Sequence, residues 1–353
     1  MKSKEVSCLL CGNPAELKFN EYPGYQEPYT FSIYHCPKCN TAFPLPKVDA
    51  SALYEYIYKN ADRVPGYNRY RRYARFIKKF TNPFEYLAES AEPYWGVKEA
   101  LSVFPVEKKP KILEIGSGLG YLTYSLIKAN YDVTGMDVSQ AAVQQAKETF
   151  GDYYICADLP EFARVNENSY DVVILTEVIE HVDNPLEFIV AILKLLKVEG
   201  RMILTTPNKS FFPEDIIWAS DLPPVHCWWF SEDSMKYIAN ILKINIRFVD
   251  YSNFYRKNYK VVGLKSQRNG HLPDSFFNND GELITKAARS KRNLKLHLQI
   301  VIHKLPFGNL ILTRLKWIIR MILGKSRQLF ENDIIICGEK GIVLCAVMQK
   351  QSF

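Results

Sequence analysis

Four cysteines near the start of the chain have the type and spacing of metal ligands. They form two C-x-x-C pairs separated by 24 residues, Cys8 with Cys11 and Cys36 with Cys39. Two such pairs suit a tetrahedral Zn²⁺ held by four thiolates, and a site closed by four protein ligands is structural rather than catalytic. Gly12 and Asn40 follow the pairs and tolerate the positive φ that a zinc knuckle requires. The alternative is a set of four buried thiols without a metal.

Three glycines form a second group that could bind a ligand, in this case through the backbone. Gly116, Gly118 and Gly120 follow a short apolar run that begins at Lys111, and an amphipathic helix is predicted after them. A strand that breaks into glycines and then opens a helix presents backbone N–H groups to a ligand. The spacing differs from a dinucleotide-binding fingerprint, which would place a glycine where Tyr121 stands.

Acidic residues accompany the predicted strands of this region. Glu114 lies two residues before the first glycine, and Asp137 ends a second predicted strand. A carboxylate at the tip of a strand can accept two hydrogen bonds from a ribose diol. Asp158 and Glu177 follow a third and a fourth predicted strand. We therefore expect the ligand at the edge of the sheet where these strands end.

The elements that must position these residues alternate between strands and helices. This order implies a parallel sheet with right-handed crossovers. A helix is predicted over 185–198, a strand over 200–208, and a further helix after Ser231, which is expected to cap it. The strand at 244–252 is expected to pair antiparallel with the strand at 341–350.

The glycine spacing, the acidic residues and the runs TEVIEH (176–181) and TPN (206–208) resemble class I S-adenosylmethionine (SAM) methyltransferases, from about Glu92 to Asp250. The resemblance implies an α/β fold with a Rossmann-like, seven-stranded methyltransferase sheet whose last strand is antiparallel. It also implies that the glycine loop and Glu114 hold the methionine moiety of SAM and that Asp137 holds the ribose. Asp158 would lie by the adenine, and Glu177 would border the methionine end.

Two histidines, His181 after the fourth predicted strand and His226 in the run PPVHCWW, are candidates for a catalytic base. Methyl transfer from a sulfonium is an in-line displacement, so the protein must mainly place the acceptor and exclude water. A hydroxyl acceptor has a high pKa and calls for a general base, and imidazole titrates near working pH. The alternative for each histidine is a structural role in its loop.

The acceptor is indicated only by resemblance. A zinc ribbon before such a core resembles bacterial methyltransferases of glycan and small-molecule pathways, which implies a small-molecule or glycan acceptor such as a sugar hydroxyl, including a lipid-linked one. A nucleic-acid acceptor is disfavoured, because strand four ends in TEVIEH and lacks the N-P-P-Y type of sequence that grips a flipped base. The alternatives are an RNA methyltransferase that binds phosphates through basic segments, and a SAM-binding protein without catalysis.

Length and composition predict a folded chain of several parts. The 353 residues are 47% apolar, and no run of 18 uncharged apolar residues predicts a transmembrane helix. The first residues lack the apolar stretch of a signal peptide, so a cytoplasmic location is expected. The expected parts are a zinc ribbon (1–46), a helical aromatic cap (47–105), the methyltransferase core (106–265), a basic amphipathic insertion (266–332) and a final core strand (333–353).

Positive charge is concentrated in the expected insertion. Eleven Lys or Arg and no acidic residue lie in 286–327, and without these cations the net charge of +7 becomes −4. A helix over 310–323 would be about 21 Å long, too short for the ~30 Å of a bilayer core. We expect the insertion either to touch an anionic membrane surface peripherally or to form a lid or dimer contact. Bases also alternate with aromatics in 67–80, which favours either phosphate binding or a connecting helix with packed arginine stems.

Overall fold

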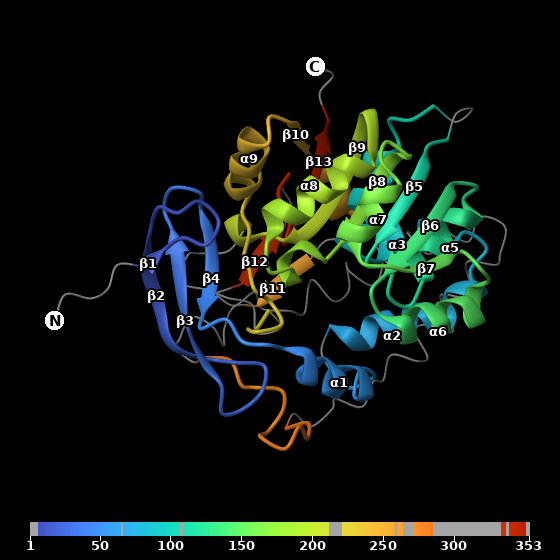
Figure 1. Ribbon diagram of the computed structural model, residues 1–353. Coiled ribbons are helices and arrows are strands. Elements are labelled where there is room, and N and C mark those ends of the chain that lie inside the picture. The colour runs from blue at the N-terminus through green and yellow to red at the C-terminus, as the bar shows by residue number, and fades with distance from the viewer. Residues whose placement is uncertain are drawn as a thin grey trace.

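Figure 1 shows the computed structural model of the chain, coloured from blue at the N-terminus to red at the C-terminus. The structure describes residues 6–64, 66–105, 109–211, 221–257, 260–263, 272–284, 333–336 and 339–350. The segment 286–327 and its predicted helix at 310–323 lie outside the described residues. Two short strands on either side of the insertion, β11 (Lys260–Gly263) and β12 (Asp333–Ile336), pair antiparallel.

A seven-stranded sheet forms the centre of the molecule. Its strands are β5 (Lys111–Ile115), β6 (Asp132–Asp137), β7 (Tyr154–Cys156), β8 (Tyr170–Thr176), β9 (Leu196–Pro207), β10 (Asn245–Phe248) and β13 (Val343–Gln349). The strand order is β10-β13-β9-β8-β5-β6-β7. β13 runs antiparallel to both of its neighbours, whereas the other adjacent pairs are parallel. This topology confirms the predicted Rossmann-like fold and its antiparallel last strand.

Alternating side chains divide the core into two layers, because successive residues of a strand point to opposite faces. In β8, Val172 and Ile174 pack in one layer, whereas Val173 and Leu175 pack in the other. The helices of the first layer are α4 (Glu92–Leu101), α5 (Tyr121–Lys128) and α6 (Gln140–Phe150), and those of the second are α7 (Leu159–Val165), α8 (Pro185–Leu195) and α9 (Glu232–Ile241). Buried on both faces, the sheet is a rigid platform for the loops at its carboxyl edge.

Two local predictions can be compared directly with the structure. Ser231 caps α9 as expected, since its hydroxyl accepts a hydrogen bond from the Ser234 N–H at 3.0 Å. The predicted helix over 185–198 is too long, and the predicted start of the next strand is too late. The reason is tertiary, because Leu196 already pairs with Tyr170 of β8 and so belongs to the sheet.

The N-terminal residues form a separate four-stranded antiparallel sheet (Figure 1). Its strands are β1 (Val6–Ser7), β2 (Pro14–Pro23), β3 (Thr30–Cys36) and β4 (Thr41–Leu45). An apolar cluster joins this sheet to helix α1 (Ser51–Lys59) and to the loop 222–229, with Ile33, Ile57 and Val225 among its buried members. The N-terminal sheet is therefore packed onto the rest of the molecule.

Helices connect the two sheets. After α1 come α2 (Tyr67–Phe76), the 3₁₀ turn η1 (Ile77–Lys79) and α3 (Pro83–Ser90), and the short helix α10 (Ser252–Lys257) follows β10. In α2, Tyr73 is buried in the first layer of the core, whereas Arg75 is exposed. Across the described part of the chain, no helix is both long and apolar enough to cross a bilayer.

Candidate active site and candidate metal centre

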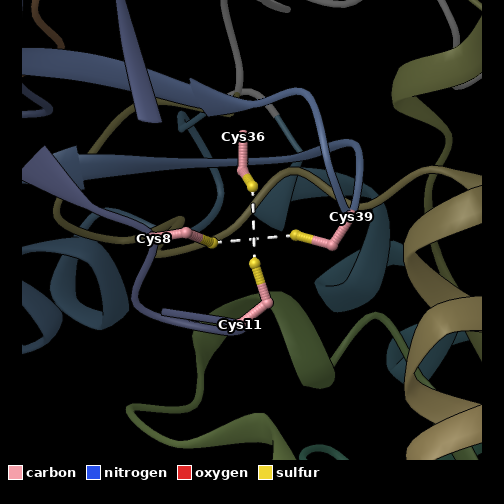
Figure 2. Close-up of side chains that lie close together, drawn as sticks. All are labelled: Cys8, Cys11, Cys36 and Cys39. Atoms are coloured by element: carbon pink, nitrogen blue, oxygen red, sulfur yellow. Dashed lines mark hydrogen bonds between the residues drawn. The ribbon is translucent and has the colours of Figure 1, made fainter. Parts of the chain in front are cut away.

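The sulfurs of the two C-x-x-C pairs converge on one point (Figure 2). Cys8 and Cys39 have their sulfurs 3.7 Å apart, Cys11 and Cys36 have theirs 3.4 Å apart, and all four lie within 4.8 Å of one another. Sulfurs bound at ~2.3 Å to a tetrahedral Zn²⁺ are roughly 3.8 Å apart. A disulfide would require about 2.05 Å. The positions of the sulfurs therefore fit a closed site for Zn²⁺.

The backbone around the cysteines has the expected knuckle conformation, and it contacts the rest of the molecule. Gly12 and Asn40 have φ values of +72° and +52°. The carbonyl of Asn40 accepts hydrogen bonds from the hydroxyls of Ser231 and Ser234, at 3.0 and 2.9 Å. These bonds attach the knuckle to the first turn of α9.

A second connection runs through β4. Ala42 and Trp229 exchange two backbone hydrogen bonds, at 3.1 and 2.9 Å. Trp229 lies three residues after His226, and both side chains are largely buried. The N-terminal sheet thus supports the loop that carries one of the candidate catalytic histidines.

The glycine loop and Asp137 lie against each other at the carboxyl edge of the central sheet. The N–H of Gly118 donates to Asp137 Oδ2 at 2.8 Å, and the N–H of Ser139 donates to Oδ1 at 2.9 Å. The two bonds hold the carboxylate in place, and each oxygen keeps a second lone pair for a hydroxyl donor. This arrangement suits a ribose diol.

The glycines of the loop are needed for two different reasons. All three have positive φ, between +48° and +78°. A Cβ on Gly120 would lie 2.7 Å from the ring of Tyr154, so close packing excludes a side chain there. A Cβ on Gly118 would meet no atom within 4 Å. The space beside Gly118, next to the Asp137 carboxylate, is therefore open.

Glu114 and Asp158 make local hydrogen bonds in the structure. Glu114 is 2% exposed, and its carboxylate accepts a hydrogen bond from the Thr123 hydroxyl of α5. Burial raises the pKa of Glu114 to about 8. Asp158 is exposed and caps α7, with Oδ1 accepting from the Glu161 N–H at 3.3 Å. Glu114 thus joins the end of β5 to α5, Asp158 caps a helix, and the contacts of both residues with SAM remain predictions.

Two glutamates follow β8, and each is bonded to a threonine of β9. Thr205 Oγ1 donates to Glu177 Oε1 at 3.2 Å, and Thr206 Oγ1 donates to Glu180 Oε2 at 3.0 Å. Glu177 has φ +57°, which is uncommon for a residue with a long side chain and typical of functional sites. Burial raises the pKa of Glu177 to about 7, against the opposing effect of the Arg69 guanidinium. Burial also raises the pKa of Glu180, and the neighbouring Glu177 carboxylate raises it further.

His181 and His226 meet beside Glu180, with His181 in the 3₁₀ turn η2 (Ile179–His181). Their ring centroids are 4.7 Å apart, and the ring planes are inclined by 75°. His181 Nδ1 lies 2.6 Å from the Val225 carbonyl, so Nδ1–H donates and Nε2 carries the lone pair of the neutral ring. Burial lowers the pKa of both rings, and the proximity of His181 lowers that of His226 further. Both are therefore neutral near pH 7 and able to accept a proton.

Arg69 is a site residue whose position the sequence did not reveal. Its Nη2 donates to the Tyr70 hydroxyl at 2.9 Å, and its charge acts on Glu177. The Tyr70 ring stacks on that of Tyr121, the residue after the glycine loop, at a centroid distance of 6.4 Å. Tyr121 in turn shares a 2.6 Å hydrogen bond with the hydroxyl of Tyr94. Helix α2 thus packs against the start of α5, next to the glycine loop, and brings one cation near the Glu177 carboxylate.

Other cations of the 67–80 stretch bond to backbone carbonyls. Arg71 donates to the carbonyl of Tyr58 at 3.0 Å, and Lys78 donates to that of Thr149 at 3.1 Å. These contacts favour the connecting-helix interpretation over a phosphate-binding surface. The alternation of basic and aromatic residues in 67–80 indicates a helix with a particular role. Only the packing shows that Arg69 is the basic residue that faces the site.

Residues 67–240 match a family described as "Methyltransferase domain". Two similar proteins are ubiquinone biosynthesis O-methyltransferases, from Hydrogenovibrio crunogenus (31% identity over 119 residues) and Photobacterium profundum (33% over 105 residues). These alignments cover 32% and 28% of this chain and 49% and 45% of the relatives, so the chain spans about half the length of the curated relatives it matches. A solved SAM-dependent methyltransferase from Archaeoglobus fulgidus aligns with a TM-score of 0.40 and 13% identity, over 72% of this chain and 91% of that one.

The matched segment contains the glycine loop, Asp137, both glutamates after β8 and both histidines. The central sheet has the predicted order of strands around these residues. The segment from residue 67 to residue 240 is therefore a methyltransferase domain.

Proposed function

We propose that the chain transfers the methyl group of SAM to a hydroxyl group of a small-molecule acceptor. The observation that carries this proposal is the contact of the glycine loop with Asp137, together with two neutral histidines at the adjacent strand end. SAM supplies an activated methyl group on sulfur. The protein supplies a place for its ribose at Asp137, room for it beside Gly118 and a base near the acceptor.

The donor is held by groups that are already fixed. Asp137 is oriented by two backbone N–H groups, so little reorganisation is needed when it accepts bonds from the ribose. Glu177 is proposed to border the methionine end, Asp158 the adenine, and Glu114 to brace the loop from below through Thr123. Helix α2 and Tyr94 are proposed to exclude water from the bound donor.

The two histidines are the proposed proton acceptors. The His181 side chain is 26% exposed and that of His226 is 11% exposed, which favours His181 as the ring that reaches the acceptor. Its Nδ1–H is engaged by Val225, so the tautomer with a basic Nε2 is the stable one. His226 is proposed to form the acceptor side of the same pocket.

A sugar of a glycan is the proposed acceptor class, with lipid-linked sugars included. Arg69, the carboxylate of Glu177 and the ring of Tyr70 are only partly buried and offer charged hydrogen-bonding groups together with an aromatic face, a combination that suits a polyhydroxylated molecule. The names of the matched relatives favour methylation of oxygen. If the acceptor is lipid-linked, we propose that the basic segment 286–327 provides peripheral membrane contact.

We propose that the cysteine cluster binds one structural Zn²⁺. The fit of its four sulfurs supports this, and so does the small size of the N-terminal sheet, whose apolar cluster is completed by residues of α1 and of the loop 222–229. With all ligands supplied by protein, such an ion has no open position for the substrate.

The function is tested with radiolabelled SAM and a panel of acceptors: nucleotide sugars, lipid-linked glycans, phenols and RNA. The expected result is label transferred to a hydroxyl-bearing small molecule, lost in Asp137→Ala and retained in Asp132→Ala, which alters the opposite end of the same strand. Label in RNA would indicate the nucleic-acid alternative. SAM binding without transfer to any acceptor would indicate a non-catalytic protein.

A further inference from the structure

Glu180, His181 and His226 form a cluster of metal-ligand type that is separate from the four cysteines. One ligand atom from each of the three lies within 4.8 Å of the others. His181 Nε2 is 3.9 Å from Glu180 Oε1, and the two imidazoles meet edge to face. Ligand atoms about 2.0–2.2 Å from a shared ion lie roughly 3–4 Å apart, so shifts of less than about 1 Å would complete a site.

One carboxylate oxygen of Glu180 and one ring nitrogen of His181 already form hydrogen bonds within the protein. Thr206 donates to Glu180 Oε2, and His181 donates from Nδ1 to the Val225 carbonyl. Outer hydrogen bonds of this kind orient the ligands of metal sites and fix the tautomer of a ligating histidine. They leave Glu180 Oε1 and His181 Nε2, which lie 3.9 Å apart, as the atoms of these two residues that can bind an ion.

Two polar atoms of the cluster have no hydrogen-bond partner among the residues that the structure describes. They are Glu180 Oε1 and His226 Nδ1, on side chains that belong to residues only 1% and 8% exposed. A buried carboxylate oxygen or imidazole nitrogen left without a partner costs about 1–3 kcal/mol or more. A ligand that satisfies both atoms at once is therefore the simplest explanation of their burial.

The charge around the cluster indicates the sign of that ligand. The negative charges of Glu177 and Asp221 raise the pKa of the Glu180 carboxyl group. The Asp221 carboxylate also lies 4.0 Å from His226 Nε2. Arg69 is the nearby cation of α2, and it acts on Glu177. A group of buried carboxylates with one guanidinium at its side favours a cation with more than one charge.

We propose that Glu180, His181 and His226 bind a divalent first-row transition-metal ion beside the acceptor. Two imidazoles and one carboxylate suit Zn²⁺, Mn²⁺, Fe²⁺ or Co²⁺ and leave positions open for a further ligand. Binding of the ion does not depend on the acceptor. Its role does rest on the proposed function: an acceptor hydroxyl bound at an open position would lose its proton to water more readily, and its oxygen would then bond to the methyl carbon as the C–S bond of SAM breaks. The histidines would act as ligands of the ion rather than as bases.

The test uses the full-length protein with Zn²⁺ bound at the cysteines, titrated with Mn²⁺ and followed by electron paramagnetic resonance. Mn²⁺ prefers oxygen and nitrogen ligands, so it does not compete for four thiolates. The expected result is one further ion per chain, bound about 10–100-fold more weakly by Glu180→Gln and by Thr206→Val. Glu187→Gln is the matched control, since Glu187 is an exposed residue in the first turn of α8.

Folding of the variants is checked by thermal unfolding with and without Mn²⁺. Glu180→Gln keeps the bond from Thr206 and removes a buried charge, so it should unfold no lower than the wild type without Mn²⁺ and gain nothing when Mn²⁺ is added. Failure of Mn²⁺, Co²⁺ and Zn²⁺ to bind beyond the cysteine-bound ion would overturn the proposal, as would binding that Glu180→Gln leaves unchanged. Titration with S-adenosylhomocysteine in the same samples separates the two proposals, because a protein that binds it without a second ion loses only the metal site.

Discussion

Loss of the metal at the cysteine cluster is expected to disturb the acceptor side of the active site and to spare the donor side. The perturbation is the double variant Cys8→Ser with Cys11→Ser, which removes half of the proposed ligands. Ligation of Zn²⁺ contributes ~10–16 kcal/mol in small zinc peptides, more than most domains have as total stability (about 5–15 kcal/mol). The N-terminal sheet should therefore unfold without the ion.

The size of the effect on the acceptor side follows from the contacts between the sheet and the segment 226–234. Asn40 accepts two hydroxyl hydrogen bonds, and Ala42 exchanges two backbone bonds with Trp229. Four hydrogen bonds at about 0.5–1.5 kcal/mol each amount to about 2–6 kcal/mol. At 1.4 kcal/mol per tenfold change, local opening of the segment should become roughly 30-fold to 10⁴-fold more frequent.

Hydrogen exchange followed by mass spectrometry measures this opening directly. Peptides covering 222–234 should lose protection in the double variant, whereas peptides covering the glycine loop at 114–126 should keep it. Cys156→Ser is the control, because Cys156 is exposed and lies outside the cluster. The reasoning would be refuted if the N-terminal sheet exchanged fully while 222–234 stayed protected, or if both regions lost protection equally.

Three further predictions concern the donor pocket and its titratable groups. Gly118→Ala should weaken binding of S-adenosylhomocysteine at least about tenfold in calorimetry, because the added methyl group would occupy the open space beside residue 118. The strain of φ +48° at this position should lower the free energy of unfolding by only about 1–2 kcal/mol. An unchanged affinity would contradict this prediction. The pKa of about 8 for Glu114 lies above its usual value, so the wild type should lose stability as pH rises from about 4.5 to 8, by at most ~5 kcal/mol at 1.36 kcal/mol per unit. Glu114→Gln should remove that loss in unfolding curves recorded at pH 5 and pH 9, and parallel behaviour of the two proteins would show the prediction to be wrong. Because burial lowers the pKa of His181 below 6.5, kcat/KM of Glu177→Gln, which lacks the neighbouring carboxyl group with a pKa of about 7, should fall only in buffer more acidic than about pH 6.5; a fall toward acid with its midpoint above about pH 7.5 would exclude a histidine as the base.

Much of the fold and part of the site could be predicted because they depend on local spacing. The C-x-x-C pairs, the glycine loop and the cap at Ser231 each lie within a few residues, so their geometry follows from short segments. The proximity of Gly118 and Asp137 follows from neighbouring parallel strands that end at the same edge.

Other features depend on contacts between distant segments, which spacing does not encode. The charge of Arg69 acts on Glu177 because α2 packs against the start of α5, and the knuckle at Asn40 meets Ser231 only through the packing of the two sheets. Glu114 was expected to hold the ligand, but its burial and its bond to Thr123 depend on how α5 packs on β5. The end of α8 was misplaced for the same reason, since pairing with β8 extends β9 to Leu196.

Calorimetric titration with S-adenosylhomocysteine is the most direct test of the account. Two hydrogen bonds from a ribose to a carboxylate, at about 1.5–3 kcal/mol each, predict that Asp137→Ala loses about 10²–10⁴-fold in affinity. Asp132→Ala, on the same strand, should bind as the wild type does. Equal affinities in all three proteins, each shown to be folded, would mean that the glycine loop and Asp137 do not hold the methyl donor.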